Sequence, residues 1–354
     1  MWMQQYLACE YLTVRGINVF NHANKNNDMI DIDGCKNVII SDCFGDSDDD
    51  ALTFKSTSGR INENITVTNC VLSSHVNAIK LGTETIGGFK NVTISNIVIK
   101  PSETIDTIYG TSKGIGGIIL EMVDGGIMDG INISNVRIDG VQTPIFLRLG
   151  NRGRTIRPDM EKPSVGIMRN ISLSNISATG ASDIGSSIQG IPGHMIENVS
   201  LSNINISYSG GGTFEDADKI LPEKEDAYPE SYMFGKLPGY GFYIRHVKNI
   251  YLDNTTFTYK NNEKRPALVC NDVAEITISG LSAEADLSAK SLILFDNVKN
   301  AIISSSRSLT STEQFISLKG DKNSDIKLIG DNFTNVKKIY ETDNEAIKDD
   351  GNLK

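Results

Sequence analysis

The 354-residue sequence has few aromatic residues and little positive charge. It contains one tryptophan, and aromatic residues make up 7% of the chain while hydrophobic residues make up 39%. We therefore expect a core built mainly from Ile, Val and Leu side chains. The 34 Lys and Arg residues are outnumbered by 44 Asp and Glu residues, which gives a net charge of −10 with His neutral. A nucleic-acid-binding protein would carry a basic face, so we expect no nucleic acid as a partner.

Paired cysteines and long apolar runs are also lacking. The five cysteines are an odd number without the spacing of a metal site, which argues against a disulfide framework and against zinc. No apolar run approaches the roughly 20 residues of a membrane span, so we expect none. Residues 1–9 show neither the basic nor the apolar region of a signal peptide. Their pattern is that of the middle of a repeat and not of its beginning. Truncation at the N-terminus is therefore one hypothesis for this chain.

A short segment recurs along nearly the whole chain. Its clearest copies are Asn37–Cys43, Asn64–Cys70 and Asn91–Ile97, and later copies begin at residues 130, 170, 198, 249, 275, 300 and 325. Successive copies start 25 to 28 residues apart where no insertion intervenes. Each copy alternates apolar and polar residues over about five positions, which is typical of a half-buried strand.

A second apolar triplet lies midway through each period, as in Ile30–Ile32, Leu52–Phe54 and Ile79–Leu81. Two or three strands per turn at a constant period predict an all-β fold, a right-handed parallel β-helix whose coils hold about 25–28 residues. We expect a single β-helix domain over residues 1–340 and a polar C-terminal tail at 341–354. A leucine-rich solenoid is less consistent with the sequence because the helical half-repeat is missing.

Each copy usually has Asn or Asp at its sixth position, which places one such residue per coil in a single column: Asp42, Asn69, Asn96, Asn135, Asn175, Asn203 and Asn254. Stacked side chains in this column are predicted to hydrogen-bond from coil to coil. Three gaps exceed the base period and locate insertions near 100–113, 149–162 and 207–236. Insertions in a solenoid project as loops, so we expect these three to form the walls of a ligand-binding face.

Aligning the midway strands brings acidic residues of adjacent coils together. Asp28, Asp50 and Asn77 share one column, and parallel strands lie about 4.8 Å apart, so residues 46–50 fall within one coil of Asp28 and Asp31. Crowded carboxylates raise the pKa of at least one of them. A protonated acid beside an ionised carboxylate is the pair that glycosidic hydrolysis needs. From spacing alone, a calcium site and a solvated acidic turn remain open alternatives.

The residues of these coils resemble a known family. Asn26–Asp31 resembles the Asn-Thr-Asp-Gly-x-Asp motif of the polygalacturonase family of glycoside hydrolases, family 28. Asp49–Ser56 resembles that family's Asp-Asp-Cys-x-Ala-x-Lys/Asn-Ser motif, in the correct order and spacing. The resemblance is strongest over about residues 7–135.

The resemblance implies a right-handed parallel β-helix that hydrolyses pectic glycosidic bonds with inversion. It implies that Asp49 is the general acid and that Asp28 and Asp50 position and deprotonate the attacking water. It further implies a polysaccharide or oligosaccharide substrate, chemistry without a metal or other cofactor, and a secreted or periplasmic location.

Two family motifs are altered in this sequence. The Gly-His-Gly motif should fall near residues 74–84, but Asn77 stands where the His is expected and His75 lies two residues earlier. The Arg-Ile-Lys motif, which binds the substrate carboxylate in the family, should align with Ile119–Glu121 and is absent. The substrate is therefore either a uronate held by other cations or a neutral pectic sugar. The candidate substrate-binding residues are Asp31, His75, Asn77, Lys80, Glu121 and Arg148.

Two other functions are consistent with the same sequence. A polysaccharide lyase would use Ca²⁺ at the Asp cluster and an Arg base, but no Arg lies in the coils of Asp28–Asp50. A non-catalytic carbohydrate-binding solenoid is favoured by the altered His and Arg-Ile-Lys motifs. An uncapped end of the solenoid would also allow oligomerisation, for which the sequence offers no direct support.

Overall fold

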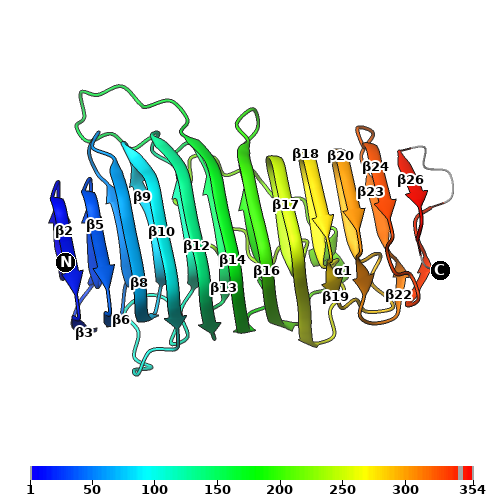
Figure 1. Ribbon diagram of the computed structural model, residues 1–354, viewed down its shortest axis with the longest axis horizontal. Coiled ribbons are helices and arrows are strands. Elements are labelled where there is room, and N and C mark those ends of the chain that lie inside the picture. Colours follow the sequence, from blue (N-terminus) through cyan, green and yellow to red (C-terminus); the bar gives the residue numbers. More distant parts are fainter. Residues whose placement is uncertain (1, 342–345, 353–354) are drawn as a thin grey trace. The chain divides into compact units, whose positions relative to one another are not determined.

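The computed structural model describes residues 2–341 and 346–352. Nearly all of its elements are β-strands, and the strands of one coil pair in parallel with those of the next (Figure 1). The predicted right-handed parallel β-helix is therefore confirmed as the fold class. The chain divides into two compact units, residues 1–178 with 223–233 and residues 179–222 with 234–354. The single domain expected over residues 1–340 stays a prediction.

Two rows of parallel strands run through the coils of the first unit. One row consists of β1 (Gln5–Leu7), β4 (Ile30–Asp33), β7 (Leu52–Ser56), β9 (Asn77–Thr85), β11 (Gly116–Met122) and β13 (Thr143–Leu149). The other consists of β2 (Glu10–Arg15), β5 (Lys36–Ser41), β8 (Asn62–Ser74), β10 (Gly88–Ile99) and β12 (Ile127–Asp139). The shorter β3 (Asn18–Asn21) pairs with β6 (Phe44–Ser47), which pairs with the end of β8, and β14 (Ile167–Ala181) follows β13 in the chain.

The core of the first unit is a set of aliphatic stacks, as expected. Residues of the midway strands lie in register from coil to coil and are at most 1% exposed: Ile30, Leu52, Ile79, Ile118 and Ile145. The second row has its own stack of Val38, Ile65, Val92 and Ile131. Each of these side chains packs on the equivalent side chain of the neighbouring coils, so a single coil could not bury its apolar face alone.

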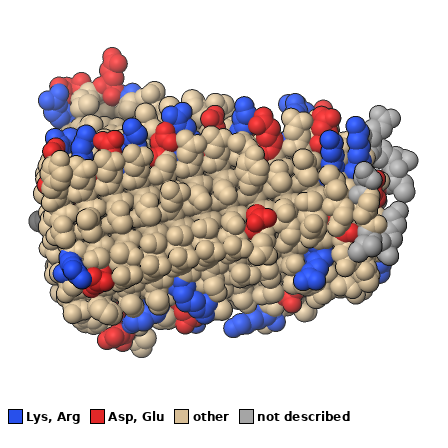
Figure 2. Space-filling model, viewed as in Figure 1, with Lys and Arg blue, Asp and Glu red and all other residues tan. Residues whose placement is uncertain are grey.

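The outward side chains of the second row are mostly uncharged. Thr66, Thr93 and Asn132 occupy equivalent outward positions on β8, β10 and β12. On the face seen in Figure 2, Lys, Arg, Asp and Glu gather mainly along the edges, while rows of uncharged side chains fill the middle. Neutral rows allow equivalent positions to stack without like charges directly opposite each other.

The turns at both ends of the repeat have a left-handed backbone. Asn91 and Asn96 have φ angles of 54° and 57°, a region that Asn adopts more readily than most residues with a side chain. Asn96 Nδ2 donates to Asn69 Oδ1 at 3.4 Å, and Asn135 Nδ2 donates to Asn96 Oδ1 at 3.2 Å. Asn175 Nδ2 in turn donates to Asn135 Oδ1 at 3.0 Å. The predicted ladder of side-chain amides is thereby confirmed in the first unit.

Replacing Asn135 with alanine tests how much this column stabilises the fold. Asn135 has a φ of 55°, where a Cβ without a compensating polar group costs about 1–2 kcal/mol. We expect Asn135→Ala to lower the free energy of unfolding by about that amount, measured by urea denaturation. Asn135→Gly removes the same hydrogen bonds but relieves the backbone, so it should cost less. Equal losses for both variants would contradict the backbone explanation.

The second unit continues the same pattern. Its strands are β15 (Ser186–Gln189), β16 (Ile196–Gly210), β17 (Phe242–Asn261), β18 (Leu268–Ser279), β19 (Ser282–Ala283), β20 (Ile293–Ser304), β21 (Arg307–Ser308), β22 (Thr312–Gln314), β23 (Ile316–Lys319), β24 (Ser324–Ile329), β25 (Val336–Lys338) and β26 (Ile347–Asp350). The helix α1 (Phe214–Ala217) has four residues, and no described helix is long and apolar enough to cross a membrane.

The polar tail predicted at 341–354 lies partly outside the described residues. Residues 342–345 and 353–354 are not described. Within the rest of that stretch, β26 pairs in parallel with β24 through Ile347 and Ile326. The described part of the tail therefore adds a strand to the last coil.

Candidate active site

Carboxylates of two adjacent coils meet at the start of the midway strands. The register pairs Ile30 of β4 with Leu52 of β7, and Leu52 with Ile79 of β9. Asp28 and Asp50 each lie two residues before these positions, which is the alignment predicted from the sequence. Their side chains are 2% and 3% exposed, so the pair lies at the edge of the buried interior.

Asp28 and Asp31 share one buried cation. Lys55 Nζ lies 3.1 Å from Asp28 Oδ2 and 3.3 Å from Asp31 Oδ1, and all three side chains are more than nine-tenths buried. Burial raises the pKa of Asp31 to about 9, although Lys55 acts to lower it, and the charge of Asp28 adds to the rise. Asp31 is therefore protonated near neutral pH. Asp31 is 0% exposed, and it contacts Lys55, which also contacts Asp28.

Asp50 has a separate set of partners on β9. Asn77 Nδ2 donates to Asp50 Oδ1 at 2.8 Å, and Lys80 Nζ lies 3.0 Å from Asp50 Oδ2. Lys80 Nζ also lies 3.9 Å from Glu230 Oε1. Burial acts to lower the pKa of Lys80, but the charges of Asp50 and Glu230 outweigh it and the pKa is raised. Lys80 therefore keeps its positive charge, and two of the predicted binding residues, Asn77 and Lys80, are brought to Asp50.

Asp49 is held through its backbone and pairs with no cation. Its N–H donates to Asn27 Oδ1 at 2.9 Å, and the Ser74 hydroxyl donates to its carbonyl oxygen at 2.7 Å. Its carboxylate accepts the N–H of Asp50 at 2.9 Å, and within the described residues it forms no ion pair with Lys or Arg. Burial first, and then the charges of Asp50 and Asp28, raise the pKa of Asp49 to about 8. One carboxyl that favours its protonated form thus lies beside two that are paired with lysines.

Glu121 and Arg148 are partners in the register of β11 and β13, and both are buried. Burial raises the pKa of Glu121 well above its usual range, although Lys80 acts to lower it, and this favours the protonated form. The Arg148 guanidinium donates to the carbonyl oxygen of Glu223 at 2.6 Å. Arg148 therefore fastens the segment 223–233 to the coil of Glu121.

That segment, part of the insertion predicted near 207–236, belongs to the first unit and lies against the carboxylate cluster. The ring of Tyr228 lies 5.8 Å from Lys80 Nζ and 5.4 Å from the guanidinium carbon of Arg152. Arg152 Nε in turn donates to Asp124 Oδ1 at 2.9 Å. The insertion thus supplies an aromatic ring and the Glu230 carboxylate from a distant part of the chain.

A cavity of about 370 Å³ lies next to the pair of Asp28 and Lys55. Lys55 Nζ lies 4.6 Å from the centre of the Trp2 ring and 3.9 Å from Glu84 Oε2. Other residues that line the cavity are Asn26, Thr57, Asp124 and Arg154. A flat aromatic ring with a few converging polar groups, in a space of this size, is typical of a small-ligand site.

His75 is not part of the carboxylate cluster. Its ring is fully buried, with Nδ1 at 2.7 Å from Asp48 Oδ1 and Nε2 at 3.0 Å from the carbonyl oxygen of Thr104. Asp46 also points to the insertion near 100–113, because its Oδ2 accepts the N–H of Glu103 at 2.8 Å. The acidic stretch 46–50 therefore divides, with only its last two carboxylates joining Asp28.

The sequence matches a model of one enzyme family, described as glycosyl hydrolases family 28, over residues 3–221. The chain belongs to family 28. The matched range contains the three carboxylates and both motifs that resemble the family, Asn26–Asp31 and Asp49–Ser56. It ends before Tyr228 and Glu230, so these two residues lie outside the part that defines membership.

Two solved structures are similar to this family 28 chain. A hyperthermoactive exopolygalacturonase from Thermotoga maritima is 22% identical, with a TM-score of 0.47, and the alignment covers 59% of this chain and 45% of that one. This chain thus matches less than half the length of that protein. The A-module of a mannuronan C-5 epimerase from Azotobacter vinelandii is 8% identical, with a TM-score of 0.38, and the alignment covers 99% of this chain and 91% of that one. No curated protein sequence matches the chain.

Three residues of the site were not among those predicted. Lys55 had a signal, because it occupies the Lys/Asn position of the second family 28 motif. Tyr228 and Glu230 lie in the insertion near 207–236, which was predicted to form a wall of the ligand-binding face, but nothing in the sequence singled out these two residues. At the place of the Arg-Ile-Lys motif, Ile119–Glu121 lies within β11 and contains no basic side chain.

Proposed function

We propose that the chain is an inverting glycoside hydrolase that cleaves pectic polysaccharides or oligosaccharides. Asp49 is the general acid, and Asp28 and Asp50 are the carboxylates that position and deprotonate water. The three carboxylates differ in their partners, and this difference carries the proposal. Asp28 and Asp50 each pair with a buried lysine, while Asp49 has no such partner. Burial raises the pKa of Asp28 as well, although Lys55 acts to lower it.

In the reaction, protonated Asp49 donates its proton to the glycosidic oxygen as the bond to the anomeric carbon breaks. Water attacks that carbon from the opposite face of the sugar, and its proton passes to the carboxylate of Asp28 or Asp50. The product therefore has the opposite anomeric configuration. Exchange with solvent returns the proton to Asp49 before the next turnover.

We infer further that the sugar at Asp49 is neutral. Lys55 faces Asp28, Asp31 and Glu84, and Lys80 faces Asp50 and Glu230. Both lysines are already paired with carboxylates of the protein. A uronate carboxylate at this position would therefore be repelled by those carboxylates. A sugar with hydroxyl groups alone avoids that repulsion.

Incubation of the purified chain with a panel of pectic substrates tests this function. The panel contains oligogalacturonides and pectic fragments that end in neutral sugars, and reducing ends, product mass and anomeric NMR signals are measured. We expect saturated products that carry a neutral sugar at the new reducing end, released with inversion, and no release from oligogalacturonides.

Each other outcome contradicts a stated part of the proposal. Release of galacturonate would reject the neutral sugar but keep the hydrolase. Unsaturated products that absorb in the near ultraviolet, with loss of activity in a chelator, would indicate a lyase. Binding without any release would leave a carbohydrate-binding solenoid.

A further inference from the structure

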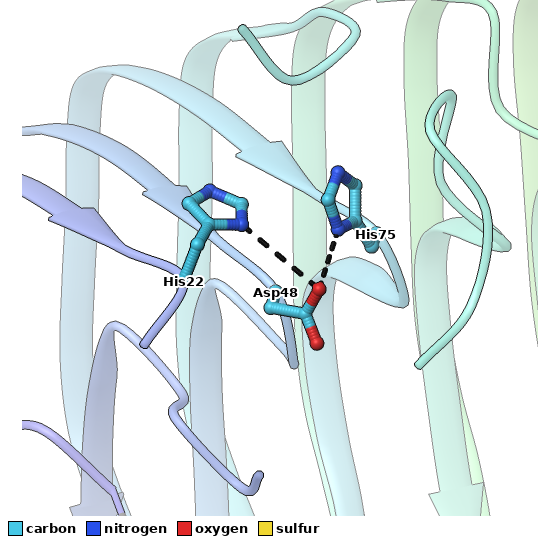
Figure 3. A group of neighbouring side chains, drawn as sticks. All are labelled: His22, Asp48 and His75. Carbon is cyan, nitrogen blue, oxygen red and sulfur yellow. Dashed lines mark hydrogen bonds and ion pairs between the residues drawn. The ribbon is translucent and has the colours of Figure 1, made fainter. Parts of the chain in front are cut away.

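A second buried polar cluster lies where β3, β6 and β8 end. His22, Asp48 and His75 each follow directly after Asn21, Ser47 and Ser74, which are partners in the register of β3, β6 and β8. Figure 3 shows the three side chains pointing toward one another. Asp48 and His75 are fully buried, and the His22 side chain is 9% exposed. The stacking of coils has therefore produced a His-Asp-His column.

In both histidines, Nε2 donates a hydrogen bond. His75 Nε2 lies 3.0 Å from the carbonyl oxygen of Thr104, which can only accept, so this nitrogen carries a hydrogen. His22 Nε2 lies 2.9 Å from Asp46 Oδ1, whose carboxylate also accepts the N–H of Glu103. In neutral rings both Nδ1 atoms therefore present lone pairs.

These lone pairs face the Asp48 carboxylate, whose two oxygens each accept a backbone N–H. Asp48 Oδ1 accepts the N–H of Ile108 at 2.8 Å, and Oδ2 accepts the N–H of Tyr109 at 3.0 Å. His75 Nδ1 lies 2.7 Å from Asp48 Oδ1, and His22 Nδ1 lies 4.0 Å from it without any hydrogen-bond partner. Two ring nitrogens and a carboxylate oxygen thus converge, and either a shared proton or a metal ion can hold such acceptors together.

We propose that this column is a zinc site, with His22 Nδ1, His75 Nδ1 and Asp48 Oδ1 as its ligands. Two imidazoles and one carboxylate are a ligand set that Zn²⁺ prefers, with bonds of about 2.0–2.2 Å. The three atoms lie within 4.8 Å of one another. Ligand atoms of a tetrahedral zinc site lie about 3.4 Å apart, so His22 Nδ1 must move inward and His75 Nδ1 must move away from Asp48 Oδ1, each by roughly 0.5–1 Å. The ion replaces the proton that His75 shares with Asp48, and water completes the coordination from the side of His22.

The surroundings of the rings resemble those of known metal ligands. A histidine that binds a metal usually donates its other N–H to a carboxylate or a carbonyl oxygen, which fixes the orientation of the ring. Asp46 does this for His22, and Thr104 does it for His75. Asp49 and its neighbours in the carboxylate cluster are not involved, so this site does not depend on the proposed hydrolase activity.

The site would join the insertion near 100–113 to the coils beneath it. That loop already contacts the column through the N–H groups of Ile108 and Tyr109 and through the carbonyl oxygen of Thr104. The Tyr109 hydroxyl also donates to Asn26 Oδ1 at 3.0 Å, beside the first carboxylate motif. Zinc would therefore act as a structural ion that holds this loop against the coils.

Titration of the whole chain with Zn²⁺ tests the proposal. The purified protein is freed of metal with a chelator, dialysed, and titrated with ZnCl₂ in a calorimeter. We expect one Zn²⁺ per chain and a higher thermal unfolding temperature with the ion. His22→Gln can still donate to Asp46 but lacks Nδ1, so it should bind at least about 10-fold more weakly. His194→Gln, which removes an exposed histidine of the other unit, should leave the affinity unchanged.

Cobalt gives a readout that needs no variant. We expect Co²⁺ bound to the wild-type chain to show the visible absorption of a four-coordinate site with nitrogen and oxygen ligands. A wild-type chain that binds no stoichiometric zinc, or a His22→Gln variant of unchanged affinity, would overturn the proposal in favour of a proton held between His75 and Asp48. Absence of the cobalt band would do the same even if the variant failed to fold.

Discussion

Replacement of Asp49 with asparagine is expected to lower kcat for natural substrates by about 10²- to 10⁴-fold, the usual contribution of a general acid. Asn has nearly the same shape, so the backbone hydrogen bonds from Asp49 to Asn27 and from Ser74 to Asp49 should persist. Substrate affinity should therefore change little. The measurement is steady-state kinetics on the best pectic substrate, together with binding of an oligosaccharide by calorimetry.

The leaving group distinguishes an acid from a merely structural residue. A nitrophenyl glycoside needs little help from a proton donor, so Asp49→Asn should lose far less activity on it than on the natural substrate. Asp28→Asn removes a carboxylate that activates water, and it should lose activity on both. The exposed Asp253→Asn serves as a control that keeps full activity. Retention of more than a few per cent of activity on the natural substrate would reject Asp49 as the acid.

Loss of Arg265 is expected to cost the second unit about 3–5 kcal/mol of unfolding free energy, because it leaves a buried carboxylate without its partner. Arg265 Nε and Nη2 donate to the two carboxylate oxygens of Glu263 at 2.8 and 2.7 Å, and both side chains are 0% exposed. Arg265 Nη1 also donates to the Leu237 carbonyl oxygen at 3.0 Å. Urea denaturation of Arg265→Met measures the cost.

Two further variants show whether the loss of unfolding free energy comes from the unpaired charge of Glu263. Arg265→Met combined with Glu263→Met removes both charges and should recover much of the lost stability. Lys290 and Asp218 form an ion pair with side chains 58% and 60% exposed, so Lys290→Met should cost about 0–1 kcal/mol. A double variant no more stable than Arg265→Met alone would show that packing, and not charge, accounts for the loss.

The periodic part of the molecule was accessible from the sequence. The pairing of Ile30 with Leu52 and Leu52 with Ile79 follows from the spacing of apolar triplets, and it brought Asp28 and Asp50 together correctly. A solenoid makes such inference reliable because each residue's neighbours are one period away. His22, Asp48 and His75 also lie 26 and 27 residues apart, so their column could have been found by the same rule.

The rest depended on side-chain direction and on insertions. Neighbouring carboxylates of the stretch 46–50 point to different partners, because β6 ends at Ser47 and the chain bends at residues 48 and 49. Asp48 therefore meets His75 while Asp50 meets Lys80. The insertion that delivers Glu230 to Lys80 has no period, and nothing in its sequence indicates which coil it contacts.

Glu230 and Tyr228 reach the carboxylate cluster from beyond residue 221, where the match to family 28 ends. The proposed acid, the two carboxylates proposed to activate water and both lysines all lie within the matched part. The residues to which we assign the chemistry and the two side chains that the insertion places beside Lys80 thus come from separate stretches of the chain. An exchange of the segment 223–233 between relatives could change which sugar is accepted without touching the residues that break the bond, so specificity in this scaffold can evolve as a module of its own.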